Sequence, residues 1–193
     1  MEYAENTDLY NYLCDQQHLS RDNPESVDLI RWAGQAAEAL EFAHSLGVYN
    51  SDIHCLNLFL DKNLNFKVGD WAGASIDGSI SQSSYRLRHR VFDADGNDVL
   101  RLTGITAMTE IFALGTALYY MVAGHDPWPE LSEPEDGEEI KKRIREQDFP
   151  DTSGLMTLGS VISRCWRVEF MSMTEVRHAI DAERDLKCKP MTG

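Results

Sequence analysis

The sequence predicts a mainly helical domain that carries one small β-hairpin. Within residues 26–46, apolar side chains recur at spacings of three and four, which places them on one face of a helix. The run TEIFALGTALYYMVAG, residues 109–124, is apolar almost all round, which is typical of a buried helix. Two short apolar runs, residues 58–60 and 66–68, flank the turn-rich DKNLN and predict the hairpin.

Capping and turn residues delimit the elements of the first half of the chain. Asn6 or Thr7 is expected to cap a short first helix, TDLYNYLCDQQ, because side-chain oxygens accept the free N–H groups of a first turn. Gly47 is expected to end the second helix. Residues 74–107 lack clear periodicity and predict a long surface loop, which at that length is usually functional or disordered.

The second half of the chain predicts further helices after the buried one. These are expected over residues 132–147, where acidic residues precede basic ones, and over residues 153–166 and 172–183. We therefore expect one domain over residues 1–183 and a flexible tail over residues 184–193.

Composition excludes several classes of protein. The formal charge of the 193 residues is -14, which argues against nucleic acid and anionic membrane as partners but leaves a nucleotide possible. The start is polar and no apolar run is long enough for a signal peptide or a membrane span, so we expect a cytoplasmic or nuclear protein. The cysteines are far apart and indicate reduced thiols, without a zinc or disulfide framework. They are Cys14, Cys55, Cys165 and Cys188.

Three polar residues around the hairpin form a constellation with a chemical meaning. Asn57 and Asp70 are expected side by side at its open end, if Leu60 lies near Lys67 across the turn. An amide oxygen and a carboxylate suit Mg²⁺, and Asp52 precedes them as a candidate base, which together is a design for phosphoryl transfer. Each residue alone is more often a turn or cap residue, so the joint spacing carries the interpretation.

That spacing matches the pattern of protein kinases, in which Asp is followed five residues later by Asn and then by Asp-Phe-Gly. The chain resembles the C-terminal lobe of a eukaryotic protein kinase from residue 1 to about residue 183. In order, the matching motifs are MEYAENTDLYNYL (hinge and next helix), EFAHSLGV, SDIHCLNLFL (catalytic loop), GDWAG (metal-binding loop), EIFALGTALYYMVAGHDPW (buried central helix) and RCWRVEFMSMTEVRHAI (closing helices).

The resemblance implies ATP and Mg²⁺ as cofactors and a protein as substrate or partner. By it, Asp52 is the catalytic base and Asn57 and Asp70 are the metal ligands. The hinge backbone that meets adenine is formed by Glu2, Tyr3 and Ala4. Phe59 is expected to pack beneath the adenine ring, or else to be an ordinary core aromatic.

Several positions depart from the family pattern. Asn50 and Ser51 precede the base where the family has His-Arg, so control by phosphorylation of the activation loop is in doubt. His54 replaces a lysine, Trp71-Ala72 replaces Phe-Gly, and Glu110 stands where the family usually has Asp.

The 193 residues begin at the hinge and carry no glycine-rich loop and no strand lysine for the ATP phosphates, which indicates a truncated chain that is weak or inactive by itself. Three hypotheses follow. The chain is an incomplete protein kinase, a kinase-like binding module without catalysis (a pseudokinase), or a fragment without a function of its own.

Overall fold

The computed structural model describes residues 4–18, 26–81 and 85–187, and within them the helical prediction is confirmed. The helices of these residues are α1 (Leu9–His18), α2 (Ser26–Ser45), α3 (Val99–Thr103), α4 (Ala107–Ala123), α5 (Glu133–Arg145), α6 (Gly159–Trp166) and α7 (Met173–Lys187), with the 3-10 turns η1 (Cys55–Asn57) and η2 (Leu87–His89). The short strands are β1 (Val48–Tyr49), β2 (Leu58–Leu60), β3 (Phe66–Val68) and β4 (Ser75–Ile76).

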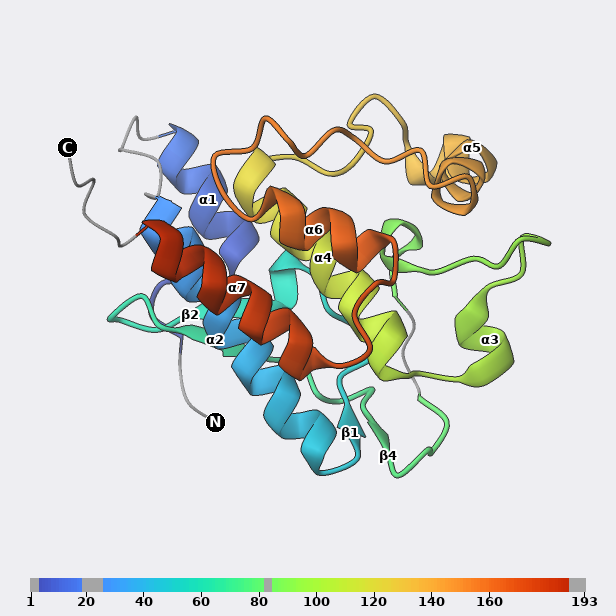
Figure 1. Cartoon of the computed structure of the whole chain (residues 1–193), viewed down its shortest axis with the longest axis horizontal. Coiled ribbons are helices and arrows are strands. Elements are labelled where there is room, and N and C mark those ends of the chain that lie inside the picture. The colour runs from blue at the N-terminus through green and yellow to red at the C-terminus, as the bar shows by residue number, and fades with distance from the viewer. Residues whose placement is uncertain (1–3, 19–25, 82–84, 188–193) are drawn as a thin grey trace.

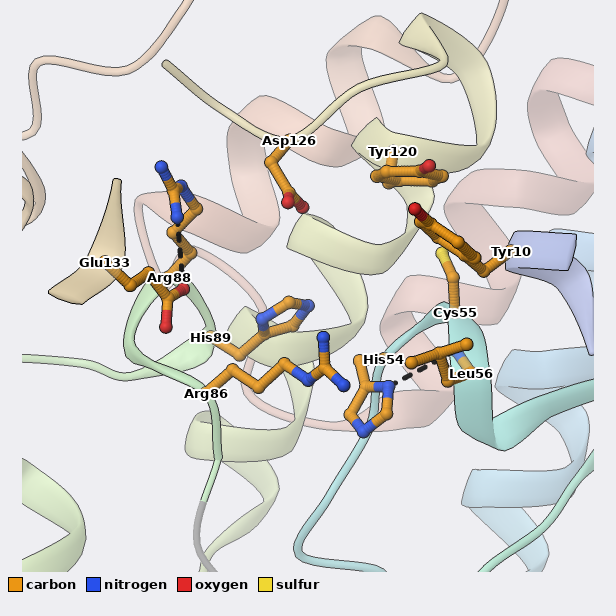
Figure 2. Close-up of a pocket in the computed structure, with 10 residues that line it drawn as sticks. All are labelled: Tyr10, His54, Cys55, Leu56, Arg86, Arg88, His89, Tyr120, Asp126 and Glu133. Carbon is orange, nitrogen blue, oxygen red and sulfur yellow. Dashed lines mark hydrogen bonds and ion pairs between the residues drawn. The ribbon is translucent and has the colours of Figure 1, made fainter. Parts of the chain in front are cut away.

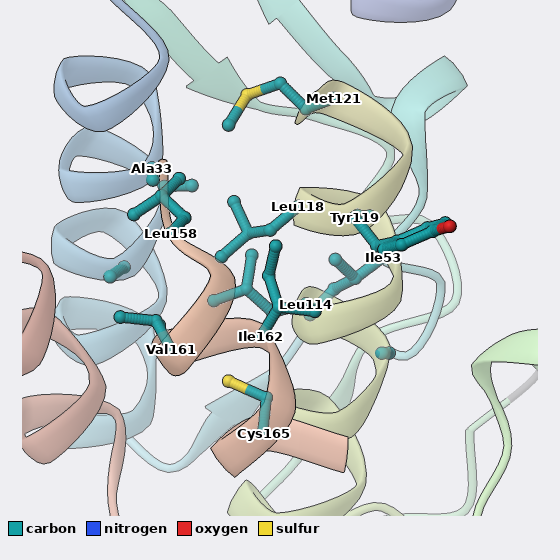
Figure 3. Close-up of a cluster of buried hydrophobic side chains, with 14 of the residues drawn as sticks. Ala33, Ile53, Leu114, Leu118, Tyr119, Met121, Leu158, Val161, Ile162 and Cys165 are labelled. Atoms are coloured by element: carbon teal, nitrogen blue, oxygen red, sulfur yellow. The ribbon is translucent and has the colours of Figure 1, made fainter. Parts of the chain in front are cut away.

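The buried helix α4 is the centre of the packing, with α6 lying along one side of it, and α2 packs along α7 (Figure 1). Helix α4 begins at a capping box between Thr106 and Thr109 and ends at Gly124, whose φ of 77° is in the left-handed region. Gly115 permits the close approach of α6, because a Cβ there would lie 2.5 Å from Cys165 Cβ. Leu114, Leu118 and other apolar side chains meet at this contact (Figure 3).

The hairpin β2–β3 has the predicted strands, but the predicted register is wrong by one residue. Leu58 lies opposite Val68 and Leu60 opposite Phe66, not Lys67. The loop between the two strands is one residue shorter than expected, because the N–H of Asp61 donates to the Asn65 carbonyl at 3.0 Å. The Asp61 carboxylate also accepts the N–H groups of Asn63 and Asn65, each at 2.8 Å.

The segment of residues 74–107 is predicted to be a surface loop, and its described residues are mostly irregular, but short regular elements and two buried basic residues interrupt the loop. Strand β4 pairs antiparallel with β1, and η2 and α3 follow. Arg88 and His89, from the basic run YRLRHR, are buried. Arg88 is tolerated there because its guanidinium donates to the carbonyls of residues 127, 128 and 131 and pairs with Glu133 at 3.1 Å.

Two helix boundaries differ from those expected. Helix α6 starts at Gly159, six residues after the expected start, because the residue before it, Leu158, has a left-handed φ of 60°. Helix α7 continues to Lys187, beyond the expected domain boundary at residue 183. In the part of the chain that the structure describes, no helix is both long and apolar enough to cross a membrane.

Candidate active site

Asn57, at the end of η1, is hydrogen-bonded to Asp52, so that two of the three residues of the predicted constellation are in direct contact. Its amide nitrogen donates to the backbone carbonyl of Asp52 at 2.9 Å and to Asp52 Oδ2 at 3.2 Å. Its amide oxygen takes no hydrogen bond from any described residue. The buried Asn57 therefore orients Asp52 with its nitrogen and keeps its oxygen available for a cation.

Asp70 lies beside Asn57 because the hairpin pairing continues past the strands. The N–H of Gly69 donates to the Asn57 carbonyl at 2.9 Å, so Asp70 follows directly at the open end. Its carboxylate is exposed and, among the described residues, accepts no hydrogen bond. Gly69 is required for this approach, since a Cβ there would lie 2.4 Å from Phe59 Cε2. The structure thus brings Asp52, Asn57 and Asp70 to one place.

Asp52 is held as a carboxylate. Partial burial raises its pKa, but hydrogen bonds from His54 and Asn57 and the charge of Arg86 outweigh burial, so that its pKa lies below the usual value. His54 Nε2 is 3.4 Å from Asp52 Oδ1, while His54 Nδ1 accepts the N–H of Leu56 at 3.2 Å. That second contact leaves the imidazole proton on Nε2, which points to the carboxylate.

Asn50, which stood out in the sequence only as a departure from the family pattern, connects the two loops of the site. Its amide nitrogen donates to the carbonyls of Gly69 at 3.0 Å and Asp70 at 3.3 Å. Its amide oxygen accepts the N–H of Asp52 at 3.1 Å. One buried amide thereby fixes the backbone of both Asp52 and Asp70.

A buried carboxylate supports the loop from below. Glu110 on α4 is fully buried, accepts the N–H of Ser51 at 2.8 Å and lies 2.6 Å from His44 Nε2 on α2. Ser51 has a φ of 74°, a strained conformation for a non-glycine residue, and its hydroxyl donates to the Gly73 carbonyl at 2.9 Å. The sequence signal for this support was one acidic residue in an otherwise apolar helix.

The hinge segment is described only in part. Glu2 and Tyr3 lie outside the described residues. Ala4 starts a turn that runs beside β2, where the N–H of Asn6 donates to the Leu60 carbonyl at 3.1 Å and the N–H of Leu60 to the Thr7 carbonyl at 3.0 Å. Phe59 is half-buried, between the fully buried Leu58 and Leu60, so its ring lies on the outer side of β2.

The residues at the open end of the hairpin fit a magnesium ion with its phosphate ligands. No group of three or more His, Cys, Asp and Glu side chains suited to a metal occurs among the described residues. Asn57 and Asp70 would supply two oxygen ligands to such an ion, and Mg²⁺ commonly binds through one or two protein carboxylates together with substrate phosphates and water. The arrangement therefore suits a metal that arrives with a phosphate ligand rather than one in a protein-only cage.

Comparisons with known proteins found a matching family model and several similar proteins. The family model described as protein kinase domain matches residues 1–176. A serine/threonine-protein kinase PDK1 of Cryptococcus neoformans var. grubii is 34% identical over 124 residues, which are 62% of this chain and 10% of that protein. CBL-interacting protein kinase 11 of Oryza sativa subsp. japonica is 31% identical over 132 residues, 66% of this chain and 25% of that protein.

A third relative is the mitogen-activated protein kinase kinase kinase zak-1 of Caenorhabditis elegans. It is 27% identical over 139 residues, 68% of this chain and 18% of that protein. The chain therefore matches between a tenth and a quarter of the length of these relatives.

Proposed function

Because this chain belongs to the protein kinase family, we propose that it carries the base and the metal ligands for phosphoryl transfer from ATP to a protein hydroxyl. In this proposal Asp52 is the base, and Asn57 and Asp70 are the magnesium ligands. Ala4, with Glu2 and Tyr3, belongs to the hinge that faces adenine, and the outer face of Phe59 lies beneath the adenine ring.

The observation that supports the proposal most is the pair of hydrogen bonds from the Asn57 amide to Asp52, at 2.9 and 3.2 Å. They make the base and one metal ligand a single rigid unit. The Gly69 to Asn57 backbone hydrogen bond, at 2.9 Å, adds Asp70 to that unit. Since positioning supplies much of the rate in phosphoryl transfer, a rigid unit of this composition is what the reaction needs.

Each residue has a defined role. Asp52, ionised and oriented by Asn57 and His54, accepts a hydrogen bond from the acceptor hydroxyl and takes its proton as the hydroxyl oxygen bonds to the γ-phosphorus of ATP. The bond from that phosphorus to the β–γ bridging oxygen breaks in the same transfer, and ADP leaves. Magnesium, when bound, neutralises charge on the phosphates. Asn57 and Asp70 contribute oxygen ligands, while Asn50 keeps the backbone of both loops in place.

A second candidate function is that of a kinase-like binding module without catalysis. The observation that favours it is that Asn50, Ser51 and Glu110 hold the loop through hydrogen bonds that involve backbone groups and no side chain of the proposed base or metal ligands. Such a network preserves the loop whether or not chemistry occurs. In that case the site residues hold a shape that a partner protein contacts.

Binding of Mn²⁺, as a paramagnetic substitute for Mg²⁺, tests the metal site in the chain itself. We expect selective broadening of the Asn57 side-chain and Asp70 backbone NMR signals in the presence of ATP, with an ATP Kd of about 1 mM. The broadening is expected to be lost in Asp70→Asn and kept in Asp77→Asn, a control on the loop after β4. Equal broadening in both variants would contradict the metal-ligand roles.

A further inference from the structure

Beside the candidate base lies a pocket of about 250 Å³ whose polar groups are not all used by the fold (Figure 2). It is formed by α1, the catalytic loop, the η2 segment, and the residues from the end of α4 to the start of α5. Figure 2 shows Asp126, Tyr120 and Tyr10 on one side of it and Arg86, His89 and His54 on the other. The volume is below the usual range for drug-sized ligands and suits a single side chain.

Two of the charged residues of the pocket are already satisfied. Arg88 uses its guanidinium on three backbone carbonyls and on Glu133, at 3.1 Å. Glu133 is neutralised by the same pair. Neither of them therefore determines the charge that a ligand meets, and that charge depends on the remaining groups.

His89 is the group whose hydrogen-bonding capacity is left unused. Its side chain is 5% exposed, neither ring nitrogen has a partner among the described residues, and Nδ1 is fully shielded. Burial, reinforced by repulsion from His54 and Arg86, lowers its pKa to about 3, so the imidazole is neutral. An unpaired buried lone pair costs less than an unpaired N–H, which places the proton on Nε2, the nitrogen that a ligand in the pocket can reach.

Opposite His89, Asp126 also has no hydrogen bond to its carboxylate among the described residues. It is half-buried, and its carboxylate points into the pocket in Figure 2. The Tyr10 and Tyr120 rings, with centroids 5.5 Å apart, place two hydroxyls on the same side. The charge of Arg86 acts on both Asp126 and His89. The pocket therefore has an anionic end at Asp126 and a cationic end at Arg86, and the charges of these two residues sum to zero.

We propose that this pocket binds a side-chain carboxamide, of glutamine or asparagine, from the polypeptide that presents its hydroxyl to Asp52. The carboxamide oxygen accepts from His89 Nε2 and Arg86, and the NH₂ group donates to Asp126 and the tyrosine hydroxyls. A basic side chain meets Arg86, and an acidic one meets Asp126, so each is repelled at one end.

The acceptor polypeptide is the occupant because of where the pocket lies. His54 and Leu56 of the catalytic loop form part of its wall, and His54 Nε2 is 3.4 Å from Asp52 Oδ1. A residue close to the acceptor hydroxyl in a peptide therefore reaches the pocket while that hydroxyl is at Asp52. This inference rests on the proposed function for the identity of the occupant, although binding is measurable without any transfer.

The experiment measures binding of fluorescein-labelled peptides to the full chain by anisotropy, without ATP or Mg²⁺. The peptides have a central serine on an alanine–glycine background, and each flanking position in turn carries Gln, Glu, Arg or Leu. At one position, Gln is expected to bind about tenfold more tightly than the other three residues. The ¹⁵N signal of His89 Nε2 is expected to shift with that peptide only.

Charge removal gives the decisive comparison. Asp126→Ala is expected to turn the preference at that position toward Glu, and Arg86→Ala toward Arg, whereas Arg101→Ala, an exposed arginine of α3, leaves it unchanged. A wild-type preference for Arg or Glu, no discrimination at any position, or an order that neither substitution alters would overturn the proposal. If the Gln preference is found, but the chain joined to a kinase N-terminal lobe ahead of Met1 shows no Asp52-dependent transfer, the proposed function fails and the pocket stands.

Discussion

The carboxylate of Glu110 accepts the backbone N–H of Ser51 at 2.8 Å, across 59 residues of sequence. Its second oxygen lies 2.6 Å from His44 Nε2. One buried acid on α4 thereby joins α2 to the catalytic loop, immediately before Asp52, and stabilises the left-handed conformation of Ser51. The geometry of the candidate base therefore depends on a residue that does not touch the site.

Replacing Glu110 by Leu is expected to lower the free energy of unfolding by about 3 kcal/mol, because it leaves the Ser51 N–H and the His44 ring without a buried partner. Urea denaturation measures this. The matched control is Glu138→Leu, an exposed glutamate of α5, which is expected to change stability by no more than about 0.5 kcal/mol. Equal effects of the two substitutions would show that the buried network contributes nothing to stability.

Gly115→Ala is expected to destabilise the fold by about 1–3 kcal/mol, since the added methyl would lie 2.5 Å from Cys165 Cβ and force α4 and α6 apart. Gly34→Ala in α2 is the control, because its methyl would have only an ordinary contact with Ile180, at 3.8 Å. There, better helix propensity is expected to leave stability unchanged or raise it by up to about 1 kcal/mol. Thermal unfolding of both variants in parallel distinguishes packing from propensity; a Gly115→Ala protein as stable as the parent would contradict the close contact.

The pH dependence of stability is expected to report His89. The pKa of His89 falls from 6.5 when unfolded to about 3 when folded, so the unfolded state binds one more proton between these values. The stability that this neutral histidine contributes is present above pH 6.5 and is lost as the pH falls toward 3, with a slope of about 1.4 kcal/mol per pH unit.

Urea titrations between pH 7 and pH 4 measure that slope as the difference between the parent and His89→Gln. The slope of the variant is expected to be smaller by about 1.4 kcal/mol per pH unit, which corresponds to one proton, whatever the absolute stability of the variant. A His89→Gln slope equal to that of the parent would mean that His89 is protonated in the folded protein.

The 193-residue chain by itself is expected to incorporate no measurable phosphate into a protein substrate. The 193 residues supply the proposed base, Asp52, and the proposed metal ligands, Asn57 and Asp70, but carry no glycine-rich loop and no strand lysine to hold the ATP phosphates. A kinase N-terminal lobe joined ahead of Met1 is expected to permit Mg²⁺-dependent transfer, measured with radiolabelled ATP, that Asp52→Asn abolishes. Turnover by the chain alone that also disappears in Asp52→Asn would contradict this expectation.

The sequence by itself determined the features that short-range patterns encode. Spacings of three and four indicated α2, the uninterrupted apolar run indicated α4, and two apolar triplets around DKNLN indicated β2 and β3 at their observed bounds. The spacing of Asn57 and Asp70 was sufficient to bring these two together, because a hairpin relates its two ends by local hydrogen bonds. The position of Asp52 depends in addition on Asn50 and, through Ser51, on Glu110.

Only the tertiary structure decided the rest, because the cost of burying a polar group depends on partners that lie far along the chain. Arg88 can be buried because its guanidinium donates hydrogen bonds to the carbonyls that follow α4. Glu110 can be buried because its carboxylate accepts the N–H of Ser51 and contacts the ring of His44. His89 and Asp126 face one pocket only once α4 and η2 are packed together. No periodicity in the sequence encodes such pairings, which arise when separate elements meet.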